Sequence, residues 1–321
     1  MFGRVQAAIG TGKKNAWLRT GSTRKRQRLK SAFGSLRGFL RYPRCVAVID
    51  PTPTTERAMP YQLIEFSVEA GVATVAFNRP ERRNAMSDEM RAEFAGALEA
   101  VSRDKAIKAL VLTGRGNAFC AGGDISGMKR RLEAPQGEVA FNGWSRQQGV
   151  HHVQSLLLGL PKPTIAAVNG AAAGLGADTA LACDFVMGTE RSKFTWSYIK
   201  RGLIPDGGGL YFLPRRVGLP RAKELIFTGR VVEADEALAL GIVDRKVAAA
   251  ELLPAAQAWA AELAQGSPTA LALSKKILNE TFEHSAHDIF NLGSQAQAIC
   301  YTSAEHRDAV TAFLAQSSSK D

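Results

Sequence analysis

Residues 162–184 have the sequence KPTIAAVNGAAAGLGADTALACD, and this stretch decides the fold. Thr164 to Val168 is a short apolar run of small and β-branched residues, which predicts a buried strand. Leu175 to Ala182 is a run of small, helix-favouring residues and predicts a buried helix. Glycines in the joint between them, residues 169–174, permit a sharp turn and the close approach of another group. Unpaired N–H groups at the start of such a helix suit a developing negative oxygen. Asp178, the carboxylate of this helix, is by itself either a structural or a functional acid.

The composition narrows the class of protein. The 321 residues are 45% hydrophobic and include 30 glycines, enough for one sizeable core with additional segments. The sequence has no apolar run of about 18 residues, so we expect no transmembrane helix. The four cysteines lie far apart, without paired histidines. This pattern favours a reducing compartment and argues against a metal site.

The net charge of +11 is concentrated at the N-terminus. Residues 1–58 contain 13 lysine and arginine residues against two acidic ones, whereas the rest of the chain carries 28 of each sign. We expect this basic leader to be disordered. It is an organelle transit peptide, an arm that binds nucleic acid, or upstream sequence that is not part of the functional protein. We favour the third interpretation and a cytoplasmic protein; the first would place the protein in the mitochondrial matrix.

After the leader, predicted strands alternate with glycine-rich loops. Residues 62–67 and 72–77 predict a β-hairpin, and Ser87 with two acidic residues behind it predicts the N-cap of a helix. A strand at residues 109–113 again ends in a glycine-rich loop. Residues 129–149 are polar and contain glycines, and we expect them to be mobile. This alternation argues for an α/β protein whose ligand binds in the loops at the strand ends.

The chain also contains four motifs in one order. They are Asn78-Arg-Pro-x-x-x-Asn-Ala-Met86, Phe119-Cys-Ala-Gly-Gly-Asp-Ile125, Pro163-x-Ile-Ala-Ala-Val-Asn-Gly-x-Ala-x-Gly174 and Gly202-Leu-Ile-Pro-Asp-x-Gly-Gly209. In this order and spacing they resemble the enoyl-CoA hydratase/isomerase (crotonase) superfamily, from Tyr61 to about Gln316. The resemblance implies an α/β fold, a ββα spiral core at residues 59–255 with a C-terminal helical trimerisation part at residues 256–321.

The resemblance also implies the ligand and the partners. The substrate would be an acyl-CoA thioester, of which coenzyme A is a part, so no separate cofactor is expected. The protein would be a homotrimer or a dimer of trimers, with no membrane or nucleic-acid partner. Family members bind the thioester oxygen in an oxyanion hole of two backbone N–H groups, and the matching positions are Ala121 and Leu175. The implied contacts with coenzyme A or the acyl group are Arg82, Ala85, Gly123, Asp124, Ile125, Tyr198 and Phe313.

Acid and base residues distinguish the reactions of the family. Hydratases typically carry two glutamates, at the positions of Asp178 and Tyr198, because adding water requires one carboxylate to deprotonate the water and another to protonate the α carbon. Asp206, in Ile-Pro-Asp-x-Gly-Gly, instead resembles the acid of the dienoyl-CoA isomerases and the ring-1,2-epoxyphenylacetyl-CoA isomerases. We therefore expect an enoyl-CoA isomerase in which Asp206 is the base. Asp178 would be a second acid or a structural one, and Tyr198 a wall of the pocket.

Three alternatives stay open at this point. A hydratase would use Asp178 and Asp206 as its catalytic pair. Asp206 would have no catalytic role if it only capped the helix that follows it. An RNA-binding protein would keep the same body and use the basic leader, residues 1–58, in which case its binding would weaken with salt.

Overall fold

The computed structural model describes residues 61–126 and 133–317, all within one compact unit that comprises residues 58–321. The basic leader expected at residues 1–58 lies outside the described residues. The structure therefore does not test the RNA-binding alternative, which depends on that leader. None of the helices in the described part of the chain is both long and apolar enough to cross a membrane.

The larger of two sheets has six strands in the order β1-β2-β3-β5-β7-β10. Its strands are β1 Ile64–Glu69, β2 Val72–Phe77, β3 Ala109–Gly114, β5 Thr164–Val168, β7 Phe185–Gly188 and β10 Arg245–Lys246. β1 and β2 form the expected antiparallel hairpin, which is tight because Ala70 and Gly71 both have a positive φ. The other neighbouring strands are parallel.

The smaller sheet has four strands in the order β4-β6-β8-β9. Its strands are β4 Ala118–Cys120, β6 Ala171–Ala173, β8 Lys193–Thr195 and β9 Val231–Glu233. β4, β6 and β8 each follow a strand of the larger sheet within a few residues, and a helical segment comes next. The expected α/β fold with a ββα repeat is therefore confirmed. The joint predicted at residues 169–174 is more than a turn, because it contains β6.

The core occupies both faces of the larger sheet, because successive side chains of a strand point to opposite sides. Leu110 and Leu112 of β3 pack with Phe94 of α1 (Asp88–Arg103). Val111, between them, packs with Trp259 of α8 (Leu252–Leu263). Since α8 covers β3 and β5, the domain boundary expected after residue 255 falls inside a helix of the core layer.

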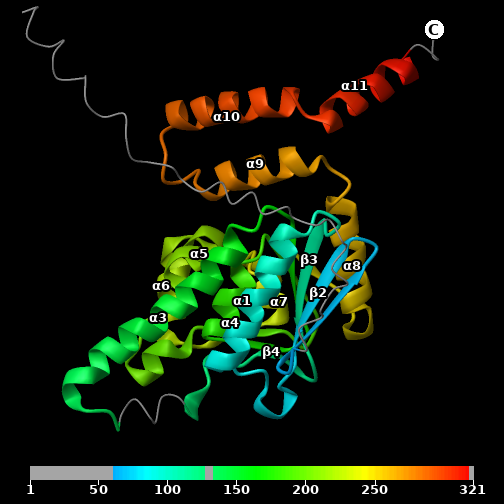
Figure 1. Ribbon diagram of the computed structural model, residues 1–321. Coiled ribbons are helices and arrows are strands. Elements are labelled where there is room, and N and C mark those ends of the chain that lie inside the picture. The colour runs from blue at the N-terminus through cyan, green and yellow to red at the C-terminus, as the bar shows by residue number, and fades with distance from the viewer. Residues whose placement is uncertain (1–60, 127–132, 318–321) are drawn as a thin grey trace, which may run out of the picture. The chain divides into compact units, whose positions relative to one another are not determined.

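Helices α1 and α3 (Gln136–Leu158) pack against each other (Figure 1). The start of α1 follows the sequence signal, since Ser87 Oγ accepts a hydrogen bond from Met90 N at 3.2 Å. Of the segment expected to be mobile, residues 136–149 belong to α3 and residues 129–132 lie outside the described residues, so its mobility stays a prediction. The buried side chains of α3 all lie in its second half, from Val150 to Leu157. The first half thus extends a helix that its second half anchors.

The remaining helical elements of the described residues are short or C-terminal. They are η1 Pro80–Arg82, α4 Leu175–Leu181, η2 Ser197–Arg201, α5 Gly209–Val217, α6 Leu219–Thr228, α7 Ala234–Ala239, η3 Ala249–Glu251, α9 Pro268–Asn279, α10 Ala286–Tyr301 and α11 Ala304–Ser317. α9 is tied to the body because Lys275 Nζ pairs with Asp184 at 2.8 Å and Asn279 Nδ2 donates to the Leu158 carbonyl at 3.0 Å. α10 packs on α9.

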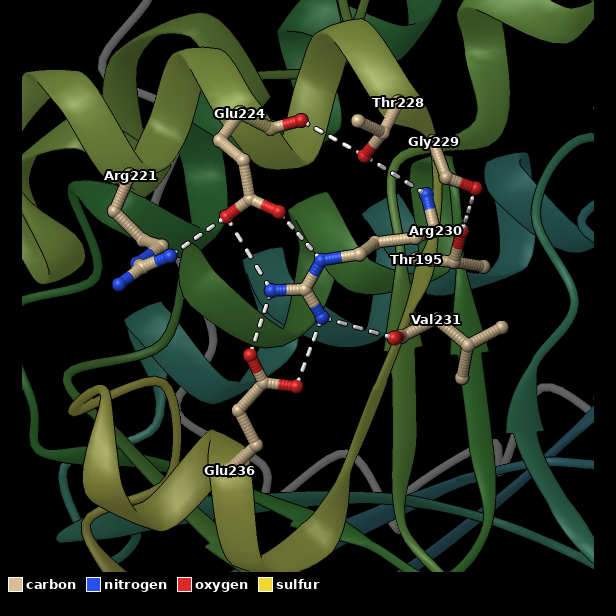
Figure 2. Close-up of polar contacts among 8 residues, drawn as sticks. All are labelled: Thr195, Arg221, Glu224, Thr228, Gly229, Arg230, Val231 and Glu236. Carbon is tan, nitrogen blue, oxygen red and sulfur yellow. Dashed lines mark hydrogen bonds and ion pairs between the residues drawn. The ribbon is translucent and has the colours of Figure 1, made fainter.

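An ion-pair network centred on Arg230 joins α6 to α7, as Figure 2 shows. The Arg230 guanidinium donates to Glu224 of α6 at 2.5 Å and to Glu236 of α7 at 2.6 Å. These side chains are partly exposed, so each pair contributes little to stability and the network mainly fixes geometry. α6 packs against η2, which carries Tyr198.

Candidate active site

Two glycine-rich segments meet at the start of α4. After β4 the chain turns through Gly122, whose φ is +100°, and a Cβ atom built there would lie 2.8 Å from the Ala173 carbonyl oxygen and 3.7 Å from the Leu175 nitrogen. A side chain at this position would therefore push the two segments apart. Met86 holds the loop from another side, since its N–H donates to the Gly122 carbonyl at 2.8 Å and its carbonyl accepts from Asp124 N at 3.1 Å.

Backbone pairing decides which N–H groups stay free in these segments. The N–H of Ala121 donates to the carbonyl of Arg83 at 2.9 Å, which contradicts the expected role of Ala121 in the oxyanion hole. Gly123 forms a parallel bridge with Met86; in such a bridge the residues flanking Gly123 make the hydrogen bonds and its own N–H points away. Within the described residues, the N–H groups of Gly123 and Leu175 have no backbone partner.

Asp178 is sealed inside the protein, with 0% of the residue exposed. Its Oδ1 accepts a hydrogen bond from Trp196 Nε1 at 2.9 Å, and its Oδ2 accepts one from the Tyr198 hydroxyl at 2.7 Å. The N–H of Gly209 also donates to this carboxylate. Burial raises the pKa of Asp178 to about 7, because the three donors offset only part of the desolvation of the charged form.

The glycines that follow Asp206 make room for these neighbours. A Cβ atom at Gly207 would lie 2.6 Å from Leu175 Cδ1 and 2.7 Å from Asp178 Oδ2. A Cβ atom at Gly209 would lie 2.5 Å from Asp178 Oδ1. The Leu175 side chain therefore packs against Gly207 of this loop.

Asp206 lies on the loop between η2 and α5 and is half-buried. The N-cap of α5 is Gly208, and no side chain caps that helix end, so the helix-cap alternative for Asp206 is not supported. His151 of α3 contacts the loop, with Nε2 3.1 Å from the Asp206 carbonyl oxygen. Burial raises the pKa of Asp206, while the nearby charges of His151 and Arg146 pull it in the opposite direction.

A cavity of about 520 Å³ joins the free N–H groups and Asp206. Its apolar wall is formed by Val139, Val150, Leu175, Tyr198, Leu203 and Ile204. Gly123, Ile125, Arg146 and Asp206 also line it, whereas Asp178 does not. Among the described residues, Asp206 is thus the one carboxylate on the cavity wall. A second cavity of about 450 Å³ lies under α9, but Lys275 and Asp184 on its wall pair with each other.

Residues 67–320 match the enoyl-CoA hydratase/isomerase family. The chain belongs to this family. It is 39% identical over 251 residues to the 1,2-epoxyphenylacetyl-CoA isomerase of Escherichia coli K12, covering 78% of this chain and 95% of that protein. It is also 39% identical over 248 residues to a putative enoyl-CoA hydratase of Thermus thermophilus, covering 77% and 96%.

Solved structures of the enoyl-CoA hydratase/isomerase family agree with this assignment. The crystal structure of an enoyl-CoA hydratase/isomerase from Cupriavidus metallidurans matches with a TM-score of 0.74 and 35% identity, covering 79% of this chain and 94% of that chain. The resemblance to the crotonase superfamily is therefore confirmed, and with it an enzyme of acyl-CoA thioester chemistry that needs no separate cofactor. Both hydratases and isomerases occur among the relatives.

The residues that the family resemblance predicts to contact coenzyme A differ in their exposure and in whether they line the cavity. Arg82 is exposed at the end of η1, and Ala85 is half-exposed beside it. Ile125 is exposed at the mouth of the cavity. Phe313 is exposed on α11 and is not part of the cavity wall. A contact between Phe313 and coenzyme A therefore stays a prediction, since it requires a neighbouring subunit.

Asp124 already has partners within its own loop. Its Oδ1 accepts a hydrogen bond from Ser126 N at 3.0 Å, and its Oδ2 pairs with Arg79 at 3.0 Å. Hydrogen bonds from Ser126 and, to a smaller extent, the Arg79 guanidinium lower the pKa of Asp124 to about 2. Its side chain is therefore engaged within the Gly122–Gly123 turn, and a contact between Asp124 and coenzyme A stays a prediction.

Sequence reasoning missed Arg146, which lies on the cavity wall in the first half of α3. Its side chain is 14% exposed, and its Nη2 lies 3.1 Å from the position of a Cβ atom at Gly123. Its carboxylate neighbour is Asp88, at 3.7 Å, which already pairs with Arg91 at 2.9 Å. The sequence offers no signal for it, because residues 136–149 are polar and glycine-containing and their apolar side chains do not recur at helical spacing.

Proposed function

We propose that the protein is an enoyl-CoA isomerase in which Asp206 is the catalytic base. The observation that carries this proposal is the single carboxylate on the wall of the 520 Å³ cavity, Asp206, beside the free N–H groups of Gly123 and Leu175. A half-buried carboxyl whose pKa is raised by burial suits a base that must accept and release a proton.

The reaction on a 3-enoyl-CoA follows from this arrangement. Asp206 removes a proton from the α carbon, and the electron pair moves onto the thioester oxygen to give a dienolate. The N–H groups of Gly123 and Leu175 stabilise that oxygen, and each such donor contributes roughly 3 kcal/mol to the transition state. Protonation at the γ carbon then moves the double bond into conjugation and yields the 2-enoyl-CoA.

The hydratase alternative lacks a second carboxylate that can reach substrate. Adding water calls for one group to deprotonate the water and one to protonate the α carbon. Asp178, the other carboxylate of that alternative, is fully buried and accepts hydrogen bonds from Trp196 and Tyr198. The position at which hydratases of the family carry their second glutamate holds a phenol here, which favours isomerisation.

The test compares two reactions of the purified full chain. 3-Hexenoyl-CoA is followed by the rise in ultraviolet absorbance of the conjugated product, and 2-hexenoyl-CoA by the fall in absorbance on hydration. We expect isomerisation to be the faster reaction and Asp206→Asn to slow it by roughly 10²- to 10⁴-fold. A wild-type protein that hydrates 2-hexenoyl-CoA but leaves 3-hexenoyl-CoA unchanged would instead be a hydratase.

We also propose that the enzyme assembles as a trimer or a dimer of trimers through its C-terminal helices. None of the described side chains of α9 and α10 is buried. Large apolar side chains are exposed along α9, α10 and α11, namely Leu278, Phe290, Ile299, Tyr301, Phe313 and Leu314. An apolar surface of this kind is typical of a subunit interface. Light scattering gives the mass directly, and a monomeric mass at micromolar concentration would contradict this proposal.

A further inference from the structure

Tyr198 separates the buried acid of the site from the cavity. Asp178 has no exposed surface and does not line the cavity, whereas Tyr198 does. The Tyr198 hydroxyl is 2.7 Å from Asp178 Oδ2. Of the three groups that donate to Asp178, Tyr198 is the one that lines the cavity, so it offers a direct route for a proton between Asp178 and a bound acyl group.

The phenol also lies between the two groups that act on the substrate in the proposed reaction. A Cβ atom at Gly174, directly before the Leu175 N–H, would lie 3.6 Å from the Tyr198 ring. A Cβ atom at Gly207, directly after Asp206, would lie 3.3 Å from the Tyr198 hydroxyl. Tyr198 is thus next to both the oxyanion donor and the base.

A carboxyl in this position has a cost that an apolar residue would avoid, because a buried carboxylate loses its hydration. Burial raises the pKa of Asp178 to about 7, so at neutral pH a large fraction of the molecules hold a proton there. In the carboxylate form the Tyr198 hydroxyl donates to Asp178 Oδ2. Protonation of Asp178 reverses that direction, because the carboxyl O–H then donates to the Tyr198 oxygen and the Tyr198 hydrogen no longer has an acceptor on Asp178.

We propose that Tyr198 is a catalytic acid that protonates the γ carbon of the dienolate, and that Asp178 resupplies it. This inference rests on the proposed isomerase function. Asp206 takes the α proton as the C–H bond breaks. The Tyr198 O–H bond breaks as the γ C–H bond forms, and the proton of Asp178 moves to the Tyr198 oxygen. Asp178 is left as a carboxylate that accepts from Trp196 and Gly209. Asp206 then loses its proton to water and Asp178 regains one from solvent.

The experiment follows 3-hexenoyl-CoA in D₂O by absorbance and mass spectrometry. In the wild type, the γ hydrogen of the product comes from solvent and is deuterium. Tyr198→Phe keeps the ring but lacks the acid, so we expect isomerisation to fall by roughly 10²-fold or more. Asp206 still removes and returns the α proton in this variant, so the unreacted substrate gains α deuterium at a rate within about threefold of wild type.

Two further variants separate chemistry from folding. Asp178→Asn keeps a polar side chain against Trp196 and Tyr198 but supplies no proton, so it should lose isomerisation and keep α exchange, as Tyr198→Phe does. Tyr211→Phe is the matched control, since the Tyr211 hydroxyl donates to the Asn279 carbonyl on α9 and should leave both rates unchanged. Circular dichroism and thermal unfolding verify that each variant is folded.

The outcomes distinguish this inference from the proposed function. Tyr198→Phe that isomerises at the wild-type rate would overturn it. So would direct transfer of deuterium from the α to the γ carbon of an α-deuterated substrate in H₂O, since one base would then perform both steps. A wild-type protein that forms no conjugated product overturns the isomerase proposal itself, and the inference with it.

Discussion

The hydroxyl of Tyr198 donates to Asp178 at 2.7 Å, so the two positions at which family hydratases typically carry their glutamates are hydrogen-bonded to each other in this chain. Trp196 occupies the other oxygen of Asp178. The carboxyl is thereby withdrawn from the cavity, whereas Asp206 lines the cavity wall. This contact places a phenol–carboxyl pair beside Asp206, the base of the proposed reaction.

The buried carboxyl should make the stability of the protein depend on pH. Burial raises the pKa of Asp178 from its ordinary value of 3.8 to about 7. Between these two values the folded state holds a proton that the unfolded state has released, so the free energy of unfolding falls as pH rises. The full loss is about 4 kcal/mol, from three pKa units.

Urea unfolding at pH 5 and pH 8 measures the part of this loss that falls between pH 5 and about 7, roughly 3 kcal/mol from two pKa units, and Asp178→Asn is the control. The amide oxygen of the variant still accepts from Trp196, and its NH₂ group donates to Tyr198, but nothing titrates at this position. We expect the stability of the variant to change much less between the two pH values than that of the wild type. Equal pH dependence in both proteins would mean that Asp178 is ionised throughout the range.

Leu175→Pro should remove an oxyanion donor with little effect on the fold. Leu175 is the first residue of α4, a position where proline is well accepted because its N–H makes no bond within the helix. Leu175→Ala is the matched control, since it shortens the same side chain and keeps the N–H. We expect kcat of the proline variant to be roughly 10²- to 10³-fold below that of the alanine variant. Equal values would show that the thioester oxygen is bound elsewhere.

Much of the fold was predictable because local signals agreed with the tertiary structure. The apolar run at residues 164–168 forms β5, the small residues after Gly174 form α4, and Ser87 caps α1. The first half of α3 was not predictable, because its residues are polar and the buried side chains that anchor the helix all lie in its second half.

The candidate site depended more on long-range contacts. Asp206 was found from its motif. The choice between Ala121 and Gly123 as donor was not accessible, because it depends on backbone pairing with Arg83 and Met86, more than thirty residues away in sequence. The contact between Tyr198 and Asp178 likewise forms only when β7 and β8 bring residues twenty positions apart together.

Arg146 should set the pH at which the base becomes active. Its positive charge lowers the pKa of Asp206, opposing the effect of burial. Activity rises with pH as Asp206 loses its proton, so Arg146→Met should shift this rising limb of the kcat profile to higher pH. Arg146→Lys keeps the charge and should shift it less. A limb that stays in place in Arg146→Met would mean that the guanidinium does not act on Asp206.

Gly207→Ala should lower both the free energy of unfolding and the activity, because the added methyl group clashes with its neighbours. The φ of Gly207 is not positive, so alanine is compatible with the backbone. The added Cβ atom, however, would lie 2.6 Å from Leu175 Cδ1 and 2.7 Å from Asp178 Oδ2. Overpacking of this kind destabilises a core by about 1–3 kcal/mol, and displacing Leu175 and Asp178 should also slow isomerisation.

Gly96→Ala is the control, because no atom lies within 4 Å of a Cβ at this exposed position in α1. That variant should gain about 0.5–1 kcal/mol in urea unfolding with unchanged activity. A Gly207→Ala protein as stable and active as Gly96→Ala would show that the loop can move away from Asp178 without consequence.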